Sequence, residues 1–173
     1  ISSMLQDSDT AVIWRGPLKI KAIKQFIADV AWGDRDYLII DSPPGTGDEP
    51  LTVAQVIPGA QGIIVTTPQD VSILDIRKSI TFCRQVSMPV LGIIENMSGL
   101  ICPYCHKRID LFRSGGGEKA AKDMDVPFLG KVPIDPDVVE AGDSGKPHVL
   151  NHRDSEAAKS FCAIVDKLES CQD

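Results

Sequence analysis

The chain has 173 residues, which fits one domain, and its hydrophobic fraction of 43% and charged fraction of 24% are ordinary for a folded protein. The net charge of −6, the lack of a basic run and an aromatic fraction of 5% argue against a nucleic-acid partner. The longest apolar runs, such as 62–65 and 90–94, are too short to cross a bilayer, so we expect no membrane partner either.

Six helices are expected. In chain order, one begins near Pro17, one covers about 50–56, one ends near Cys83, one covers 118–124, one covers 136–141, and the last is capped by Asp154 or Ser155. The first has an apolar face at Ile23, Phe26, Ile27 and Val30; the third has one at Ile73, Ile76, Ile80 and Cys83; the last has one at Phe161, Ile164, Val165 and Leu168. Because Cys83 lies on such a face, we predict that it is a buried structural thiol.

Four short apolar runs predict buried strands, since they do not alternate with polar residues and so suit a sheet covered on both faces. The runs are Tyr37–Ile40, Gly62–Thr66, Val90–Ile94 and Phe128–Val132. Helical segments separate them, which predicts parallel strands joined by crossover helices. The expected fold class is therefore α/β, a mainly parallel sheet flanked by helices on both faces.

Polar or loop residues follow each predicted strand, at Asp41, Thr66, Asn96 and Pro133. Ligands of such sheets bind beyond the carboxyl ends of the strands, so we expect these residues to converge on one edge. Asp41 opens the glycine- and proline-rich loop 42–48, and a strand that delivers an Asp is how P-loop NTPases place a carboxylate near Mg²⁺. The alternative is a turn or capping Asp.

Asn96 and the segment Gly130–Asp135 also run from a strand into a loop. The Asn96 amide offers a donor and an acceptor, which matches an adenine edge, although an Asn in this position is often only a turn residue. Pro133 can pack on a base, and nearby backbone groups can bond it. Each of these signals is weak when it is taken alone.

Five cysteines occur, and only Cys102 and Cys105 are close together, in the motif Cys-Pro-Tyr-Cys. An odd number with one close pair is not a secreted disulfide framework, so we expect a cytoplasmic location. Two thiolates can hold part of a metal or cluster site, and two chains can complete four ligands by symmetry. Zinc, a thioredoxin-like dithiol and an inert pair are the alternatives.

Taken in order, these motifs resemble the Mrp/ApbC branch of the MinD-like P-loop ATPases, from Ile13 to about Leu168. The most specific segments are 14–17 (Trp-Arg-Gly-Pro), 41–48 (Asp-Ser-Pro-Pro-Gly-Thr-Gly-Asp), 66–70 (Thr-Thr-Pro-Gln-Asp), 95–98 (Glu-Asn-Met-Ser), 102–105 (Cys-Pro-Tyr-Cys) and 114–119 (Ser-Gly-Gly-Gly-Glu-Lys). The resemblance implies a homodimeric ATPase that passes a [4Fe–4S] cluster to apo-proteins.

The resemblance also implies roles for individual residues. Cys102 and Cys105 would hold a cluster that bridges two subunits, and Asp41 would be the Walker B aspartate near Mg²⁺. Gly45 would belong to the switch loop that senses the γ-phosphate of ATP. Contacts to the adenine of ATP or ADP would come from Asn96 and from the segment that contains Val132, Pro133 and Asp135.

One part of the family pattern is absent. The sequence holds no Gly-x-x-x-x-Gly-Lys-Ser/Thr motif, and the strand and helix that surround it in the family are missing too. Because the chain also starts with Ile1 rather than Met, we expect residues 1–173 to be the C-terminal portion of one P-loop NTPase domain, with an inserted cysteine loop at about 97–117. ATP hydrolysis is expected of the whole protein.

Two other functions are compatible with the sequence. One is a MinD/ParA-like nucleotide-dependent scaffold, in which the cysteine pair holds structural zinc. The other is a thiol oxidoreductase that uses Cys102 as its nucleophile.

Overall fold

The computed structural model describes residues 13–102, 104, 105 and 107–170. Two compact units make up the chain, Ile1–Ala60 and Gln61–Asp173, and each is described here by itself. Among the described residues, none of the helices could span a lipid bilayer.

The first unit contains two helices, α2 (Gly16–Asp29) and α3 (Asp48–Val56), which pack against each other. Pro17 lies in the first turn of α2, as the sequence predicts. An ion pair of 2.7 Å between Lys19 Nζ and Glu49 Oε1 joins the two helices. No residue of α2 is buried, so its predicted apolar face is only partly covered.

The predicted strand Tyr37–Ile40 is wrong for this structure, where these residues form an exposed, irregular segment. Ile39 is 84% exposed and Tyr37 is 55% exposed. A strand needs a partner for its backbone N–H and C=O groups, and the described residues of the first unit contain no other strand. The apolar run is therefore present without the pairing that would make it a strand.

The second unit is built on a parallel sheet of three strands in the order β1 (Gly62–Thr66), β2 (Val90–Glu95), β5 (Phe128–Lys131). Ile64 pairs with Ile93, and Glu95 pairs with Lys131. All three strands lie where the apolar runs predict them, and they run in parallel as the helical connections predict.

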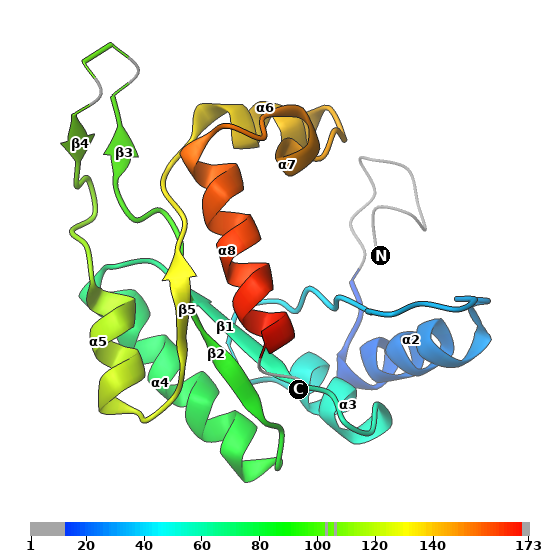
Figure 1. Cartoon of the computed structure of the whole chain (residues 1–173). Coiled ribbons are helices and arrows are strands. Elements are labelled where there is room, and N and C mark those ends of the chain that lie inside the picture. The colour runs from blue at the N-terminus through cyan, green and yellow to red at the C-terminus, as the bar shows by residue number, and fades with distance from the viewer. Residues whose placement is uncertain (1–12, 103, 106, 171–173) are drawn as a thin grey trace. The chain divides into compact units, whose positions relative to one another are not determined.

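Helices cover both faces of this sheet (Figure 1). On one face, α4 (Asp70–Gln85) and α5 (Gly116–Asp123) pack on β1 and β2, and on the other α8 (Glu156–Ser170) packs on β5. Successive residues of a strand point to opposite faces, so Ile93 belongs to the core under α4 and α5, while Ile94 packs against the core under α8. The predicted α/β class is confirmed for this unit.

The remaining elements are two short helices and a small hairpin. α6 (Pro136–Asp143) was expected, whereas α7 (His148–Asn151) was not. The Ser155 hydroxyl accepts a hydrogen bond of 3.0 Å from the Ala158 N–H and so caps α8, which confirms one of the two predicted caps. β3 (Leu100–Ile101) and β4 (Arg108–Ile109) pair antiparallel within the predicted cysteine loop.

The core under α4 and α5 yields a stability prediction. Ile80 is 0% exposed and Val71, on the same helix, is 75% exposed. We expect Ile80→Ala to lower the free energy of unfolding by about 3 kcal/mol, because it leaves a cavity. Val71→Ala should lower it by less than about 0.5 kcal/mol. Urea unfolding measures both, and equal losses would contradict this packing.

Candidate functional site

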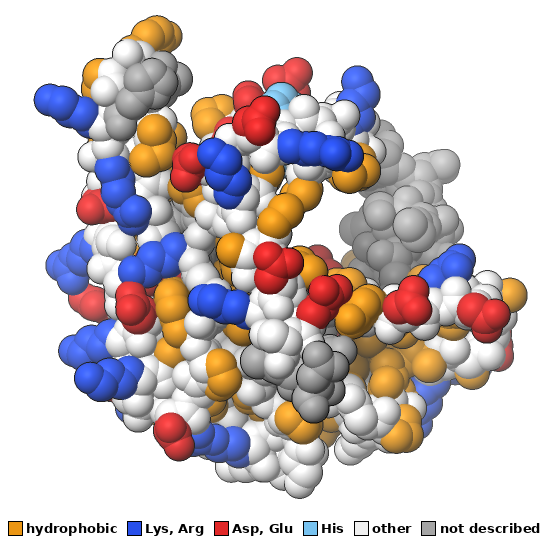
Figure 2. Space-filling model, viewed as in Figure 1, with side chains coloured by type: hydrophobic (Ala, Val, Ile, Leu, Met, Phe, Trp, Pro, Cys, Tyr) orange, Lys and Arg blue, Asp and Glu red, His pale blue; other side chains and the backbone are white. Residues whose placement is uncertain are grey.

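The close cysteine pair lies at the free end of the β3–β4 hairpin. Leu100 pairs with Ile109, and the Cys102 N–H donates to the Lys107 carbonyl at 3.0 Å, which closes the end of the hairpin. Cys102 is half-buried, Cys105 is exposed, and both are free thiols. Figure 2 shows hydrophobic side chains at this free end, where Tyr104 is 93% exposed. Solvent or a partner can therefore reach the pair.

The hairpin favours the thiolate form of Cys102. The backbone N–H of Cys105, then that of Tyr104, and then the Cys105 side chain donate to its sulfur and lower the pKa of the Cys102 thiol. The thiolate is the form that binds metals and attacks electrophiles. Cys83 differs, because burial in the core under α4 raises the pKa of its thiol. Its predicted structural role agrees with its 5% exposure.

One hairpin supplies only part of a metal site from the residues that are described. Positions 103 and 106 lie outside them, and within the rest no group of three or more His, Cys, Asp or Glu side chains is placed to hold a metal ion. Cys162, on α8, is exposed and free. The described ligands for a thiophilic metal at the hairpin are thus Cys102 and Cys105.

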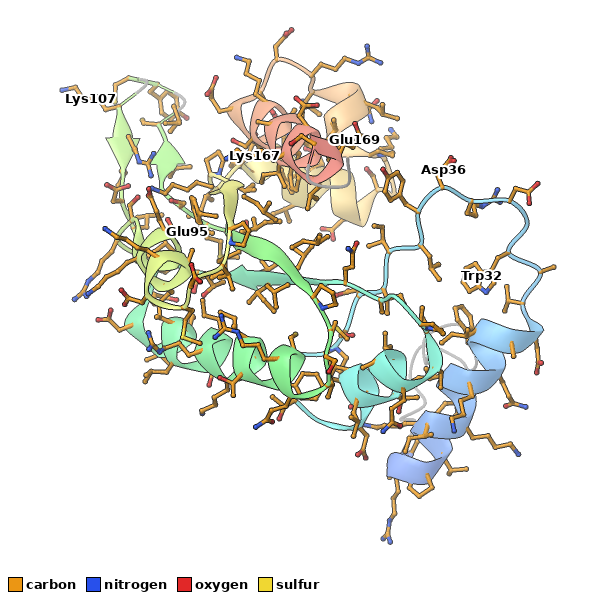
Figure 3. The ribbon with its side chains drawn as sticks, turned by 60° about the horizontal axis from the view of Figure 1, so that its bottom comes forward. Trp32, Asp36, Glu95, Lys107, Lys167 and Glu169 are labelled. Atoms are coloured by element: carbon orange, nitrogen blue, oxygen red, sulfur yellow. The ribbon has the colours of Figure 1, made fainter. Side chains whose placement is uncertain are left out.

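A buried carboxylate that the sequence analysis did not single out lies at the base of the hairpin. Glu95, the last residue of β2, is 0% exposed. Its oxygens accept hydrogen bonds from Ser98 Oγ at 2.6 Å, Gly117 N at 2.7 Å and Gly115 N at 3.0 Å. Figure 3 shows Glu95 beside the first turn of α5, whose N-terminal dipole also favours a negative charge. These donors replace the water that burial removes.

The Ser-Gly-Gly-Gly segment therefore has a structural task. Gly115 has a φ of 87°, a conformation that favours glycine. A Cβ on Gly117 would lie 3.1 Å from the Glu95 Cβ, so a larger residue would push the carboxylate away. The segment brings two N–H groups close to one carboxylate, and it does not have the spacing of a phosphate-binding loop.

The turn after β2 connects the carboxyl ends of all three strands of the second unit. Asn96 N donates to the Thr66 carbonyl at 2.7 Å, and Val132 N donates to the Glu95 carbonyl at 2.9 Å. Ser98 N in turn donates to the Val132 carbonyl at 3.0 Å. Thr66 and Asn96, two of the four residues expected to converge, thus meet at one edge together with Val132, which precedes the third, Pro133. The fourth, Asp41, belongs to the first unit.

The residues predicted to contact adenine differ in which hydrogen-bonding groups they have available for a ligand. Asn96 Oδ1 accepts from Met97 N at 2.9 Å, whereas its amide nitrogen makes no hydrogen bond to any described residue and can donate to a ligand. Val132 is 4% exposed, and both of its backbone polar groups are bonded within the fold. Pro133 is half-buried beside it. Their role at a nucleotide stays a prediction.

Asp135 lies in a cluster with a buried histidine that the sequence analysis did not identify. It caps α6 by accepting from Asp137 N at 3.0 Å, and its Oδ2 lies 3.6 Å from His148 Nε2. The same Nε2 lies 2.8 Å from Ser155 Oγ. A hydrolytic triad needs the acid and the serine on opposite ring nitrogens, so this cluster is not one. It joins α6, α7 and α8.

Asp41 and Gly45 belong to the first unit, so their relation to Asn96 stays a prediction. Both are exposed, and Gly45 has a φ of 101°, which favours glycine in the loop. At the end of this loop, the Asp48 carboxylate lies against Gly16 and leaves no room for a Cβ there. The Trp-Arg-Gly-Pro segment and the end of the Asp41 loop thus meet within the first unit.

Comparison with known proteins gives one family and several relatives. A family model described as NUBPL iron-transfer P-loop NTPase, of the ParA group, matches residues 1–169. An iron–sulfur cluster carrier protein of Methanocaldococcus jannaschii is 54% identical over 169 residues, which are 97% of this chain and 58% of that protein. The chain therefore spans little more than half the length of this curated relative.

Solved structures agree with this result. A nucleotide-binding protein from Archaeoglobus fulgidus in complex with ADP is 42% identical, with a TM-score of 0.67 over 75% of this chain and 53% of that one. The septum site-determining protein MinD of Pyrococcus horikoshii, complexed with Mg-ADP, is 26% identical, with a TM-score of 0.64 over 94% of this chain and 64% of that one. The fold is thus that of MinD-like P-loop NTPases.

The buried carboxylate gives a second stability prediction. In Glu95→Gln, an NH₂ group replaces one of the oxygens that accept from Ser98 and the two glycines. We expect the free energy of unfolding to fall by about 2 kcal/mol or more, since a buried donor loses its acceptor. Glu118→Gln is the matched control, because Glu118 is exposed and its one ion pair to a described residue is with Lys131. If the Glu95→Gln protein were as stable as the control, the three hydrogen bonds to Glu95 would not have the structural role described here.

The thiols give a prediction for pH. Because the pKa of Cys102 is lowered, its reactive thiolate should persist to lower pH than that of an ordinary cysteine. We expect alkylation of the metal-free chain, followed by peptide mass spectrometry, to label Cys102 below the pH range of a free thiol. Folded Cys83 should resist labelling, because it is buried and its pKa is raised. Labelling of Cys102 only at alkaline pH would contradict the hydrogen bonds at the hairpin end.

Proposed function

The chain belongs to the NUBPL-type iron-transfer P-loop NTPases of the ParA group, and from this premise we propose that it forms part of an iron–sulfur cluster carrier. In this proposal the whole protein binds ATP or ADP with Mg²⁺ and delivers a [4Fe–4S] cluster to apo-proteins. The cluster is the cargo of the reaction, and the hairpin that carries Cys102 and Cys105 is its binding site.

The observation that carries the proposal is the pair of free thiols at the end of the β3–β4 hairpin. Thiolates are the ligands of iron–sulfur clusters, and the hairpin favours the thiolate of Cys102 by N–H donation. A site that hands over its cargo must also be reachable by the recipient, and Cys105 is exposed. A buried pair would hold a cluster without passing it on.

A [4Fe–4S] cluster takes four thiolate ligands, of which the described residues of one hairpin offer two. We infer that two copies of the chain share the cluster across a two-fold axis, each supplying Cys102 and Cys105. The exposed Tyr104 and the other apolar side chains at the hairpin end would then be covered by the second copy. The proposed assembly is a homodimer with apo iron–sulfur proteins as its transient partners.

The nucleotide part of the proposal rests on the edge of the sheet. The amide nitrogen of Asn96, together with Val132, Pro133 and Asp135, would contact adenine. Asp41 would act near Mg²⁺, with Gly45 in the adjoining switch loop. The Archaeoglobus fulgidus relative was solved in complex with ADP, which supports nucleotide binding in this family. Hydrolysis would need the phosphate-binding loop that the 173 residues do not contain.

We also propose that residues 1–173 form the C-terminal portion of a single P-loop NTPase domain, with the cysteine hairpin as an insertion at about 97–117. Spanning 58% of a carrier at 54% identity supports this. We propose a cytoplasmic location, since a reducing compartment would keep Cys102 and Cys105 as thiols. A zinc-holding scaffold of the MinD kind has less support, because the MinD relative is only 26% identical.

The test is anaerobic loading of the chain with iron and sulfide. We expect about two iron atoms per chain, because one [4Fe–4S] cluster serves two copies. Cys102→Ser with Cys105→Ser should remove nearly all of the bound iron, while Cys162→Ser, an exposed cysteine on α8, should leave the iron content unchanged. Full iron loading of the double variant would refute the proposal, and binding of zinc alone by the native chain would favour the scaffold.

A further inference from the structure

The β3–β4 hairpin cannot fix its own direction. Its ladder consists of two residue pairs, Leu100 with Ile109 and Ile101 with Arg108. Two-stranded hairpins are marginally stable by themselves, so the orientation of this one depends on contacts at its base. In Figure 1 the hairpin extends away from the parallel sheet.

The side chain of Arg108 makes four hydrogen bonds at that base, beside a backbone bridge between Leu100 and Ile134. Its Nη2 donates to the Ser98 carbonyl at 3.0 Å, to Ser98 Oγ at 3.4 Å and to Ser114 Oγ at 3.2 Å. Its Nε donates to Asp110 Oδ1 at 2.8 Å. One planar guanidinium thus joins β4 to the segments that precede β3 and follow β4, a geometry that suits arginine and not lysine.

Ser98, which accepts hydrogen bonds from Arg108, is itself bonded to the core. Ser98 is 2% exposed, and its hydroxyl donates to the buried Glu95 carboxylate at 2.6 Å. The Ser98 N–H also donates to the Val132 carbonyl. The hairpin is therefore attached through Arg108 and Ser98 to the carboxyl ends of β2 and β5.

The Arg108 side chain and its partner Asp110 pack directly against the backbone of Gly99. It has a φ of 80°, and a Cβ there would lie 2.8 Å from Arg108 Nε and 2.9 Å from Asp110 Oδ1. The guanidinium lies over a backbone that carries no side chain, so the fold leaves space for it. The position of the Arg108 guanidinium therefore depends on a glycine at position 99.

We propose that Arg108 is a positioning residue, which sets the orientation of the hairpin and thereby of Cys102 and Cys105 toward the thiols of a second copy. The proposal rests on the proposed function, because positioning matters only if two hairpins must meet around one cluster. Arg108 acts through Ser98 and Ser114 and does not touch the cluster itself.

The test compares Arg108→Gln with Arg113→Gln in the 173-residue chain. Arg113 is the matched control, because it is an arginine that closely follows β4 and pairs with Asp70 at the surface. The two side chains of that pair are 77% and 84% exposed. The first measurement is hydrogen exchange of residues 100–109 in the metal-free protein. The second is the rate at which a chelator removes iron from the loaded protein.

We expect Arg108→Gln to raise hairpin exchange and to speed iron release about fivefold or more, because several hydrogen bonds are lost together. Exchange in β2 and α5, and the melting temperature, should stay near the native values. Ser114→Ala removes one of the acceptors and should speed release about twofold. Arg113→Gln should behave as the native chain, and Arg108→Lys should resemble Arg108→Gln.

The proposal would be overturned if the Arg108→Gln protein showed the same hairpin exchange and the same rate of iron release as the Arg113→Gln protein. A rise in exchange over the whole second unit would also overturn it, because Arg108 would then be a general stability residue. Failure of the native chain to load iron would instead refute the proposed function. The exchange measurement needs no cluster, so even in that case it shows whether Arg108 holds the hairpin in place.

Discussion

The arrangement of the second unit depends on one buried carboxylate. Glu95 ends the central strand with no exposed surface, and buried acceptor oxygens in such a place need hydrogen-bond donors. Ser98, Gly115 and Gly117 supply them. This requirement brings the start of α5 and the turn after β2 to the same point, and so it fixes both ends of the hairpin segment.

The position of Glu95 has consequences for the proposed function. Asn96, the predicted adenine contact, is its neighbour in sequence, and Ser98, which carries the base of the hairpin, is its hydrogen-bond partner. A nucleotide that moved this turn would therefore move the hairpin and its thiols. Such coupling requires that the nucleotide prefer one hairpin orientation over another. The short turn 95–98 is the physical connection between the two proposed sites.

The sequence allowed correct prediction of the elements whose partners lie close along the chain. Gly62–Thr66 and Phe128 onward became strands because apolar runs on either side of amphipathic helices can pair in parallel. Tyr37–Ile40 has the same composition, but pairing is a property of the surrounding chain, and no described strand of its unit is available. Composition predicts that a segment can be a strand, whereas a neighbour decides whether it is one.

The candidate site was predictable in part. The spacing of Cys102 and Cys105 identified the thiol pair, but nothing in the spacing showed that Arg108 orients it. Glu95 had a usable signal, since an acidic residue that ends a fully apolar strand must find donors, and the Ser-Gly-Gly-Gly segment is rich in free N–H groups. His148 had none, because its partners Asp135 and Ser155 are brought together only by the packing of α6, α7 and α8.

Native mass spectrometry of the anaerobically loaded chain can show whether two copies pool their thiols around one cluster. We expect a species with the mass of two chains and one [4Fe–4S] cluster, with no loaded single chain. A single chain that carries a complete cluster would contradict it.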